Sequence, residues 1–400
     1  MPYIDNKGRM SRSGFLFSSE LAIYPAFRRV AEIIVDKFNL NGYVFAPEEY
    51  DGSSVYESSR KFEKADFDTN TTSLKVHFIP VRKGYVRRFG FKEASFNMLL
   101  RQIRPDYIWI HSEFWEGIAR QFLWHYRLQR HPRIIARIAT NNVKGKTSFF
   151  SLKWPFVSRT RFLQMILWSR LNGVVAVSAK SMECARRMGL PDCVPIVNNY
   201  HPVLGPDDAA DIKIDLPWRR DSSFTIGFAG LFLEQKGWKV LLDGVERLPE
   251  RFKVVLVGDG PQKEELLSRI SKLGLRGRAY YAGWLPQQKL LATYPLFDVL
   301  VLPSVTLPPS PEQFGCVLAE AMACGVPVIG SNSGAIPETV GQAGLIVPEG
   351  DPDALAKAIF KISEDDHLRK RAIAWGLERY RTHYSCEAYA RSIVELLHIP

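Results

Sequence analysis

The sequence predicts an α/β protein of two domains, each built around a parallel β-sheet. Short runs of β-branched and aromatic residues alternate with longer amphipathic runs through almost the whole chain, as strands alternate with crossover helices. The 400 residues also exceed what one hydrophobic core usually supports. Residues 201–222 are rich in Pro and Asp and lack sustained periodicity, so we place the domain boundary there.

The elements of the first half follow from this alternation. Strands are expected at 14–18, 43–46, 75–80, 106–110, 134–139 and 173–178, with helical periodicity between them, for example at 21–38 and 115–129.

In the second half, strands are expected at 224–229, 253–257, 279–282, 298–302 and 326–330, and helices at about 237–248, 262–273, 287–295, 314–324 and 352–363. Right-handed crossovers place the carboxyl ends of parallel strands on one edge, where open sheets bind ligands. The unusual Gly and polar residues of this half all follow a strand.

Composition narrows the class of protein. With 46% hydrophobic and 24% charged residues, the chain has a globular composition. Its five Cys are an odd number without the paired spacing of a metal site, which favours reduced thiols in the cytosol. Because we find neither a signal-peptide pattern nor an apolar run near the roughly 20 residues needed to span a bilayer, we expect a cytoplasmic protein.

Charge is unevenly distributed along the chain. Residues 1–200 hold 31 Lys and Arg against 17 Asp and Glu, whereas residues 201–400 hold 22 against 25. Segment 144–170 has no Asp or Glu and mixes basic with aromatic residues, which suits the inner face of an anionic membrane. The alternatives are a generally basic enzyme and, for the segment, a core helix after a solvated basic loop. No nucleic-acid-binding motif is found, so we expect no nucleic-acid partner.

Two glutamates stand out in the second half. Glu312 lies in a Pro- and Gly-bounded loop after an apolar strand, and Glu320 lies in the following short helix among Ala and Met. A carboxylate on such an apolar helix face is costly to desolvate unless hydrogen-bond donors reach it. A ligand rich in hydroxyl groups is one source of such donors.

Two further features favour an anion site. Gly230 ends a strand, and Lys236 with Gly237 begins a helix six residues later; the helix N-terminus and the ammonium group together suit a phosphate. Gly315, just before the next helix, lets a diphosphate approach the bare backbone. Each feature alone is equally compatible with an ordinary turn.

In order and spacing, these pieces resemble the retaining GT-B glycosyltransferases with an E-x7-E motif, glycosyltransferase family four (group 1). The resemblance covers residues 224–350 closely. The matching pieces are Phe228-Ala229-Gly230 with Lys236-Gly237, Val257-Gly258-Asp259-Gly260-Pro261, Ala282-Gly283-Trp284-Leu285, the run 298–304, Glu312-Gln313-Phe314-Gly315, the run 320–329 and the run 344–348.

The resemblance implies two Rossmann-like domains that face each other across a cleft. Residues 1–205 would bind the acceptor and residues 206–380 the nucleotide sugar. The last helix, within 381–400, would cross back to pack on the first domain.

The resemblance also implies the chemistry. A hexose would pass, with retention and without a metal or cofactor, from a UDP- or GDP-sugar to a glycan or polyprenyl-linked acceptor in cell-surface polysaccharide or glycoconjugate synthesis. The implied site residues are Lys236 at the departing diphosphate, Glu312 with the Phe314 and Gly315 backbone at the sugar, Glu320 at the ribose, Gly230 and Leu285 elsewhere on the donor, and His111 and Asn141 on the acceptor side.

The sequence departs from the family at several positions. Leu231 stands where the family commonly has an Arg that joins the Lys on the diphosphate, Asn141 lies near the place of the usual His, and a Gly-rich loop is missing after the first strand. A binding subunit with weak catalysis and a nucleotide-sugar epimerase or hydrolase of the same fold are therefore alternatives.

Overall fold

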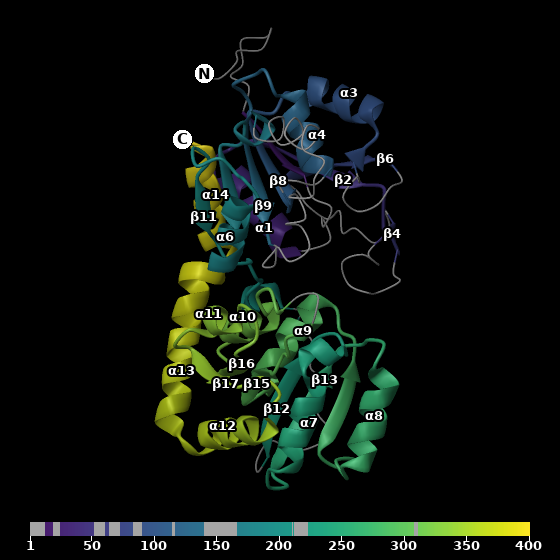
Figure 1. Ribbon diagram of the computed structural model, residues 1–400, viewed down its shortest axis with the longest axis vertical. Helices are drawn as coiled ribbons and strands as arrows, with labels where there is room; N and C mark the ends of the chain where they lie inside the picture. Colours follow the sequence, from purple (N-terminus) through teal and green to yellow (C-terminus); the bar gives the residue numbers. More distant parts are fainter. Residues whose placement is uncertain are drawn as a thin grey trace, which may run out of the picture. The chain divides into compact units, whose positions relative to one another are not determined.

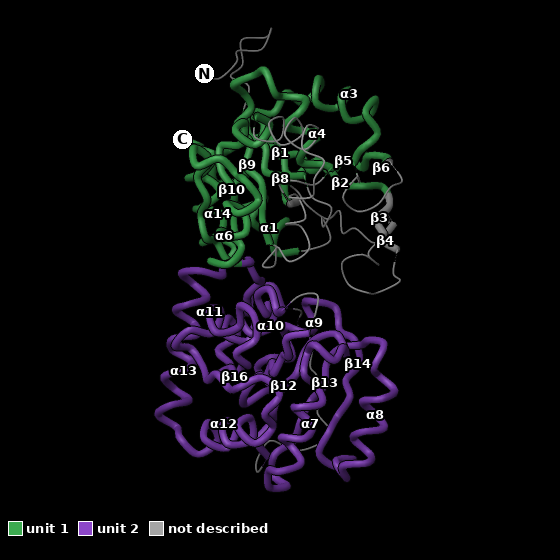
Figure 2. Tube along the Cα trace, in the orientation of Figure 1, with its two compact units in different colours: residues 1–200, 386–400 green, residues 201–385 purple. Residues whose placement is uncertain are grey.

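The computed structural model describes residues 13–18, 25–51, 61–63, 73–82, 90–113, 117–139, 166–209, 211, 223–307 and 311–400. The chain forms two compact units (Figures 1 and 2). Unit 1 comprises Met1–Tyr200 and Cys386–Pro400, and unit 2 comprises His201–Ser385. Each unit has its own parallel sheet flanked by helices, so the predicted pair of Rossmann-like domains is confirmed.

Unit 1 is built on a seven-stranded sheet with the order β11-β10-β9-β8-β1-β2-β5. Its neighbouring strands are all parallel. The strands are β1 (Gly14–Ser18), β2 (Asn41–Pro47), β5 (Leu74–Ile79), β8 (Tyr107–Glu113), β9 (Arg133–Ile138), β10 (Gly173–Ala176) and β11 (Ile196–Asn198). Two short antiparallel pairs are added, β3 (Glu49–Asp51) with β4 (Lys61–Glu63) and β6 (Val81–Arg82) with β7 (Gly90–Phe91).

Helices cover both faces of this sheet. The helices are α1 (Pro25–Lys37), α3 (Glu93–Ile103), α4 (Gly117–His125), α6 (Ala179–Arg187) and α14 (Cys386–Leu397). Phe96 of α3 and Phe122 of α4 pack on Phe45 of β2 in the main core. The last helix, α14, packs beside α1 although the two are far apart in the sequence (Figure 2). The expectation that the final helix returns to the first domain is therefore confirmed.

Unit 2 has a six-stranded parallel sheet with the order β14-β13-β12-β15-β16-β17. The chain adds β13 and β14 on one side of β12, then returns to place β15 on the other side. Loops after β12 and β15 therefore diverge at the switch point where such sheets bind ligands. The strands are β12 (Phe224–Ala229), β13 (Phe252–Val257), β14 (Ala279–Gly283), β15 (Val299–Leu302), β16 (Val328–Ser331) and β17 (Gly344–Val347).

Helices connect the strands of unit 2, and two more follow β17 (Figure 1). They are α7 (Trp238–Glu246), α8 (Lys263–Lys272), α9 (Gln287–Thr293), α10 (Cys316–Ala323), α11 (Ile336–Val340), α12 (Pro352–Glu364) and α13 (Asp366–Arg379), with short turns η5 (Glu234–Lys236), η6 (Tyr294–Leu296) and η7 (Tyr380–Tyr384).

Two glycines bring backbone segments of unit 2 unusually close together. Gly237 has φ +71°, and a Cβ added there would lie 1.8 Å from the carbonyl oxygen of Pro303. Gly334 has φ +54°, and its added Cβ would lie 2.0 Å from the carbonyl oxygen of Glu312. Any side chain at either position would displace a loop beside the switch point, and the positive φ adds strain.

We predict that Ile393→Ala, in α14, lowers the free energy of unfolding of unit 1. Ile393 is fully buried, and truncation of such a side chain costs roughly 2–5 kcal/mol. Denaturant unfolding followed by circular dichroism measures the change. Leu128→Ala is the matched control because Leu128 is 88% exposed; equal effects of the two variants would contradict the packing role of α14.

Candidate functional site

The loops at the switch point of unit 2 place an ammonium group against a carboxylate. Lys236 ends the turn η5 after β12, and Glu312 follows β15. The Nζ atom of Lys236 lies 2.7 Å from Oε2 of Glu312, and the two side chains are 25% and 9% exposed. The ion pair is therefore partly desolvated, and it joins residues that are 76 positions apart.

Glu312 is held in its charged form. The Ser304 hydroxyl, itself buried, donates a hydrogen bond of 3.1 Å to the same oxygen, Oε2. Burial raises the pKa of Glu312, but the Lys236 charge and the hydrogen bonds from Lys236, Ser304 and the Gln313 backbone outweigh it, so the pKa lies below its usual value. The site thus contains a buried anion beside a cation.

A chain of hydrogen bonds from Thr339, Tyr384 and Arg379 fixes the backbone after Glu312. The carbonyl oxygen of Phe314 accepts a 2.7 Å hydrogen bond from the Thr339 hydroxyl. The Thr339 carbonyl oxygen in turn accepts hydrogen bonds from the Tyr384 hydroxyl at 2.7 Å and from Arg379 Nε at 2.9 Å. Gly315 is buried and has φ +83° at the start of α10. The structure therefore brings Glu312, Phe314 and Gly315 together at one helix N-terminus.

Glu320 lies in the second turn of α10 and is only 6% exposed. The Tyr294 hydroxyl donates to its Oε2 at 2.5 Å, and the Gln287 amide donates to its Oε1 at 2.7 Å. Burial raises the pKa of Glu320 above its usual value, although both hydrogen bonds oppose this shift. Burial and the nearby Glu320 also raise the pKa of Cys324 to about 12.

The donors of Glu320 correct part of the sequence reasoning. A buried carboxylate in α10 was expected to need donors, with a ligand as one source, but the protein itself supplies Gln287 and Tyr294. The sequence predicts the need for donors, because Ala and Met residues surround Glu320 in the helix. Their identity was not, because the contact depends on how α9 and η6 pack against α10.

The other residues expected on the donor lie on the same edge of the sheet. Gly230 directly follows β12 and has φ +152°. Leu231 comes next and is half-buried. Trp284, which is 59% exposed, and Leu285 follow β14. Their contacts with a donor stay predictions.

On the acceptor side, His111 lies within β8 and is nearly fully buried. Its ring centroid is 3.8 Å from that of Phe27 in α1, and Trp109 is also adjacent. This environment favours a packing role for His111. Asn141 lies outside the described residues, as does most of the basic segment 144–170.

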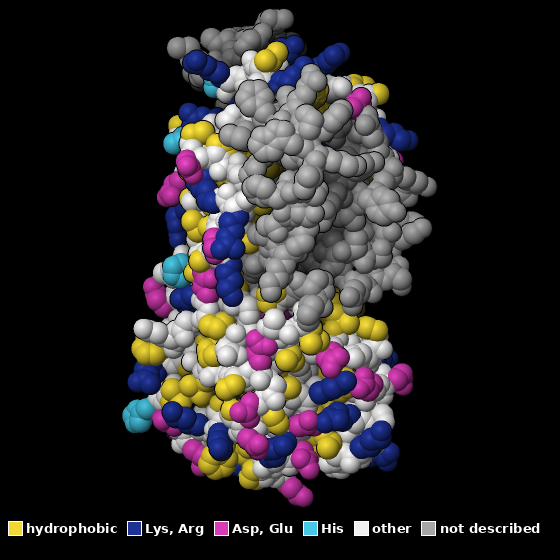
Figure 3. Space-filling view, in the orientation of Figure 1, with side chains coloured by type: hydrophobic (Ala, Val, Ile, Leu, Met, Phe, Trp, Pro, Cys, Tyr) yellow, Lys and Arg dark blue, Asp and Glu magenta, His cyan; other side chains and the backbone are white. Residues whose placement is uncertain are grey.

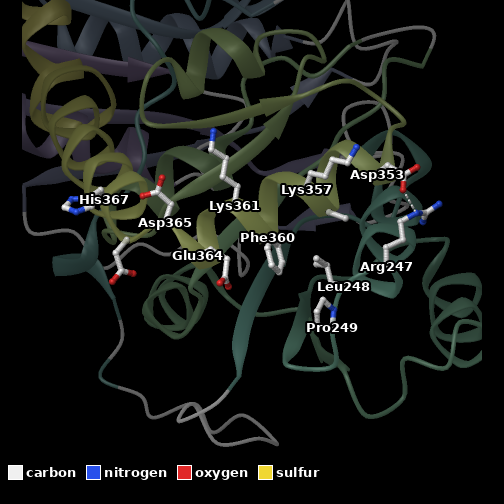
Figure 4. A pocket seen from close by; sticks show the side chains of 12 residues that line it. Arg247, Leu248, Pro249, Asp353, Lys357, Phe360, Lys361, Glu364, Asp365 and His367 are labelled. Atoms are coloured by element: carbon white, nitrogen blue, oxygen red, sulfur yellow. Dashed lines mark ion pairs between the residues drawn. The ribbon is translucent and has the colours of Figure 1, made fainter.

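Unit 2 has a second concave surface, a groove of about 950 Å³ between the end of α7 and α12 (Figure 4). Leu248 and Pro249 line it just before β13, so it lies near the edge where the strands begin. Phe360 faces the groove, and Arg247 pairs with Asp353 at 2.8 Å. Acidic and basic side chains balance along it, so it does not suit a diphosphate as the Lys236 site does.

The residues that the structure describes contain neither a metal-binding cluster nor a membrane-spanning helix. No group of three or more His, Cys, Asp and Glu side chains is arranged to hold a metal ion there. None of the helices among those residues has the length and apolar character needed to cross a membrane.

Comparisons with known proteins point to one enzyme group. Residues 216–379 match the profile described as glycosyl transferases group 1. The 2-deoxystreptamine N-acetyl-D-glucosaminyltransferase of Streptomyces fradiae is 29% identical over 315 residues, which cover 74% of this chain and 71% of that protein. The O-antigen chain mannosyltransferase B of Escherichia coli is 34% identical over 191 residues, which cover 46% of this chain and 44% of that protein.

The fold is shared over nearly the whole chain. The crystal structure of Anabaena HepE in complex with UDP-glucose is similar with a TM-score of 0.64 at 16% identity, covering 96% of this chain and 99% of that one. Together with the two parallel-sheet units, this similarity confirms the GT-B fold.

We predict that Glu312→Gln and Glu320→Gln change stability with opposite pH slopes. Glu312 has a lowered pKa and contributes stability above the usual carboxyl value of about 4.3, which is lost as the pH falls through its lower pKa. Glu320 has a raised pKa and contributes stability at low pH, which is lost as the pH rises through that higher pKa. Unfolding free energies of both variants and the wild type, measured from acid to neutral pH, test this; parallel slopes would contradict it.

Proposed function

We propose that the protein transfers a hexose from a nucleotide-diphosphate sugar, with retention and without a metal, and that unit 2 binds the donor. The observation that carries this proposal is the Lys236–Glu312 pair at the switch point, followed by α10 with Glu320. The match to glycosyl transferases group 1 supports it. UDP-glucose bound to the similarly folded HepE supports a UDP- or GDP-sugar as the donor.

In this proposal the site stabilises charge on the leaving group. As the bond from the sugar to the diphosphate breaks, negative charge grows on the phosphate oxygens. The Lys236 ammonium and the backbone N–H groups at the start of α10, near Phe314 and Gly315, offset that charge. Glu312 accepts hydrogen bonds from hydroxyls of the transferred sugar. Glu320 accepts them from the ribose.

Retention follows if the acceptor hydroxyl attacks from the face that the diphosphate leaves. A new bond joins the acceptor oxygen to the anomeric carbon, and the departing phosphate takes the acceptor's proton. Glu312 is not assigned as a nucleophile because this same-face attack forms no bond between the sugar and the protein.

We propose a glycan or polyprenyl-linked saccharide as the acceptor, with unit 1 binding it. The E. coli relative, named as an O-antigen chain mannosyltransferase, supports a cell-surface glycan. The name of the S. fradiae relative specifies 2-deoxystreptamine, so a small aminocyclitol acceptor is the specific rival.

We predict that Lys236→Ala lowers kcat/KM for transfer about 10- to 150-fold, since a charge-assisted hydrogen bond is worth roughly 1.5–3 kcal/mol. Lys239→Ala is the matched control, because Lys239 lies three residues further on and pairs with Glu265 on the surface. Steady-state transfer from UDP- and GDP-sugars gives the measurement. Because Leu231 leaves Lys236 without the family's usual Arg, no second cation from that position can compensate.

Three outcomes of the same experiments would count against the proposal. If no nucleoside diphosphate in a panel raised the melting temperature, the donor assignment would be wrong. Rapid consumption of donor without acceptor would favour a hydrolase or epimerase. If the donor bound without any transfer, and Glu312→Ala left donor binding unchanged, a binding subunit would be favoured.

We also propose that unit 1 binds an anionic membrane surface at which a lipid-linked acceptor would lie. Helix α3 exposes Met98, with 61% of the residue accessible, and helix α4 exposes Trp124, with 55% accessible. Trp124 lines one pocket together with Arg120 and Arg127. The Arg127 guanidinium lies 4.3 Å from the Trp124 ring. Exposed apolar side chains next to cations suit an interface with anionic lipid. On the face of unit 2 in view, acidic and basic side chains are interspersed (Figure 3).

We predict that the protein sediments with vesicles of phosphatidylglycerol and phosphatidylcholine at low salt, and that Trp124→Ser reduces the bound fraction severalfold. Trp375→Ser is the control, because Trp375 is an exposed tryptophan on α13 of unit 2. Failure of the wild type to sediment, or equal losses in both variants, would refute the membrane surface.

A further inference from the structure

We infer that Tyr294 is a positioning residue that orients the Glu320 carboxylate toward the ribose. We also infer that the ribose hydroxyls displace Gln287 from its hydrogen bond to Oε1 of Glu320. This inference rests on the proposed binding of a nucleotide sugar in unit 2, and it adds two residues to that site.

The first step is the placement of Tyr294. It begins η6 directly after α9, and its side chain is fully buried. Its ring packs edge-on against Phe297 at 6.1 Å between centroids. The hydroxyl donates to Oε2 of Glu320 at 2.5 Å. Tyr294 therefore holds one carboxylate oxygen from inside the protein, where no ligand can replace it.

The second step concerns Gln287. It begins α9, is only partly buried, and donates from Nε2 to the other oxygen, Oε1, at 2.7 Å. A glutamine side chain at the start of a helix rotates away far more readily than a buried ring. The two oxygens of Glu320 are thus unequal: a buried donor holds Oε2, and an exchangeable donor covers Oε1.

The third step is the energetic reason for this arrangement. A buried carboxylate with neutral donors contributes less stability than well-packed apolar side chains of similar volume would. Phenylalanine would fill the space of the Tyr294 ring, so the hydroxyl adds only the hydrogen bond. The two hydroxyls of a ribose can both donate hydrogen bonds to a carboxylate whose orientation is fixed. Fixing Oε2 leaves Oε1 at a defined position for them.

The hydrogen bond also controls the charge of Glu320. The pKa of this carboxyl is raised by burial, and the Tyr294 hydroxyl is the larger of the two opposing hydrogen bonds. Removing the hydroxyl should raise the pKa further, so nucleotide affinity should fall at a higher pH than in the wild type as the solution is acidified. A merely structural tyrosine would not move this pH profile.

The test measures calorimetric affinities for UDP and 2′,3′-dideoxy-UDP, or for the guanosine pair if GDP gives the larger thermal stabilisation. Tyr294→Phe should weaken UDP binding about tenfold and the dideoxy form less than about twofold, because only the ribose hydroxyls contact Glu320. Gln287→Ala should leave UDP binding equal to or tighter than that of the wild type. Tyr389→Phe, which removes a buried hydroxyl in α14, is the matched control and should change neither affinity.

A second pair of variants keeps the test decisive if Tyr294→Phe folds poorly. In a Glu320→Gln background no buried charge is left unpaired, and adding Tyr294→Phe should cause no further loss of UDP affinity. A further loss would overturn the inference, because Tyr294 would then act independently of Glu320.

The remaining outcomes separate the inference from the function on which it rests. If the wild type bound UDP and its dideoxy form equally, the ribose role of Glu320 would fail. If the wild type distinguished them and Tyr294→Phe distinguished them equally well, the ribose role would stand and the positioning role of Tyr294 would be refuted. Equal weakening of UDP binding by Gln287→Ala and Tyr294→Phe would show that Gln287 is not displaced.

Discussion

The arrangement of unit 2 depends on how buried carboxylates are compensated. Glu312 is removed from water at the switch point, and such a group is stable only when a charge and hydrogen bonds replace its hydration. Lys236, in the loop after β12, supplies that charge: its Nζ atom lies 2.7 Å from Oε2 of Glu312. The ion pair thereby fixes the relative position of the loops after β12 and β15. Phe314 and Gly315 follow Glu312 directly, so the start of α10 is set by the same contact.

The two buried glutamates are compensated by different kinds of partner. Glu312 has a cationic partner and a lowered pKa, whereas Glu320 has two neutral donors and a raised pKa. The two parts of a nucleotide also differ in charge: the diphosphate carries formal charge, whereas the ribose carries only hydroxyl dipoles. In the proposed function, Lys236 meets the diphosphate, Glu312 the transferred sugar, and Glu320 with its two neutral donors the ribose.

Much of this could be predicted from the sequence because it is local. The strand at 224–229 was bounded correctly since its apolar run is sharply limited. Lys236, Glu312 and Gly315 all lie in connections that follow predicted strands. The edge strands β11 and β17 were not among the predicted strands, as they are short and only partly buried. β8 continues to Glu113 because it pairs beyond residue 110 with β9. The donors Gln287 and Tyr294 were out of reach, because they meet Glu320 only through helix packing.

The close backbone approaches at Gly237 and Gly334 have a consequence for how this scaffold can change. Because main-chain atoms of Pro303 and Glu312 abut these glycines, the spacing of the charged pair is a property of the backbone and not of adaptable side chains. Substitutions that leave this spacing unchanged are then easiest at exposed neighbours such as Gln313. The geometry of the Lys236–Glu312 pair can stay constant while the residues around it change.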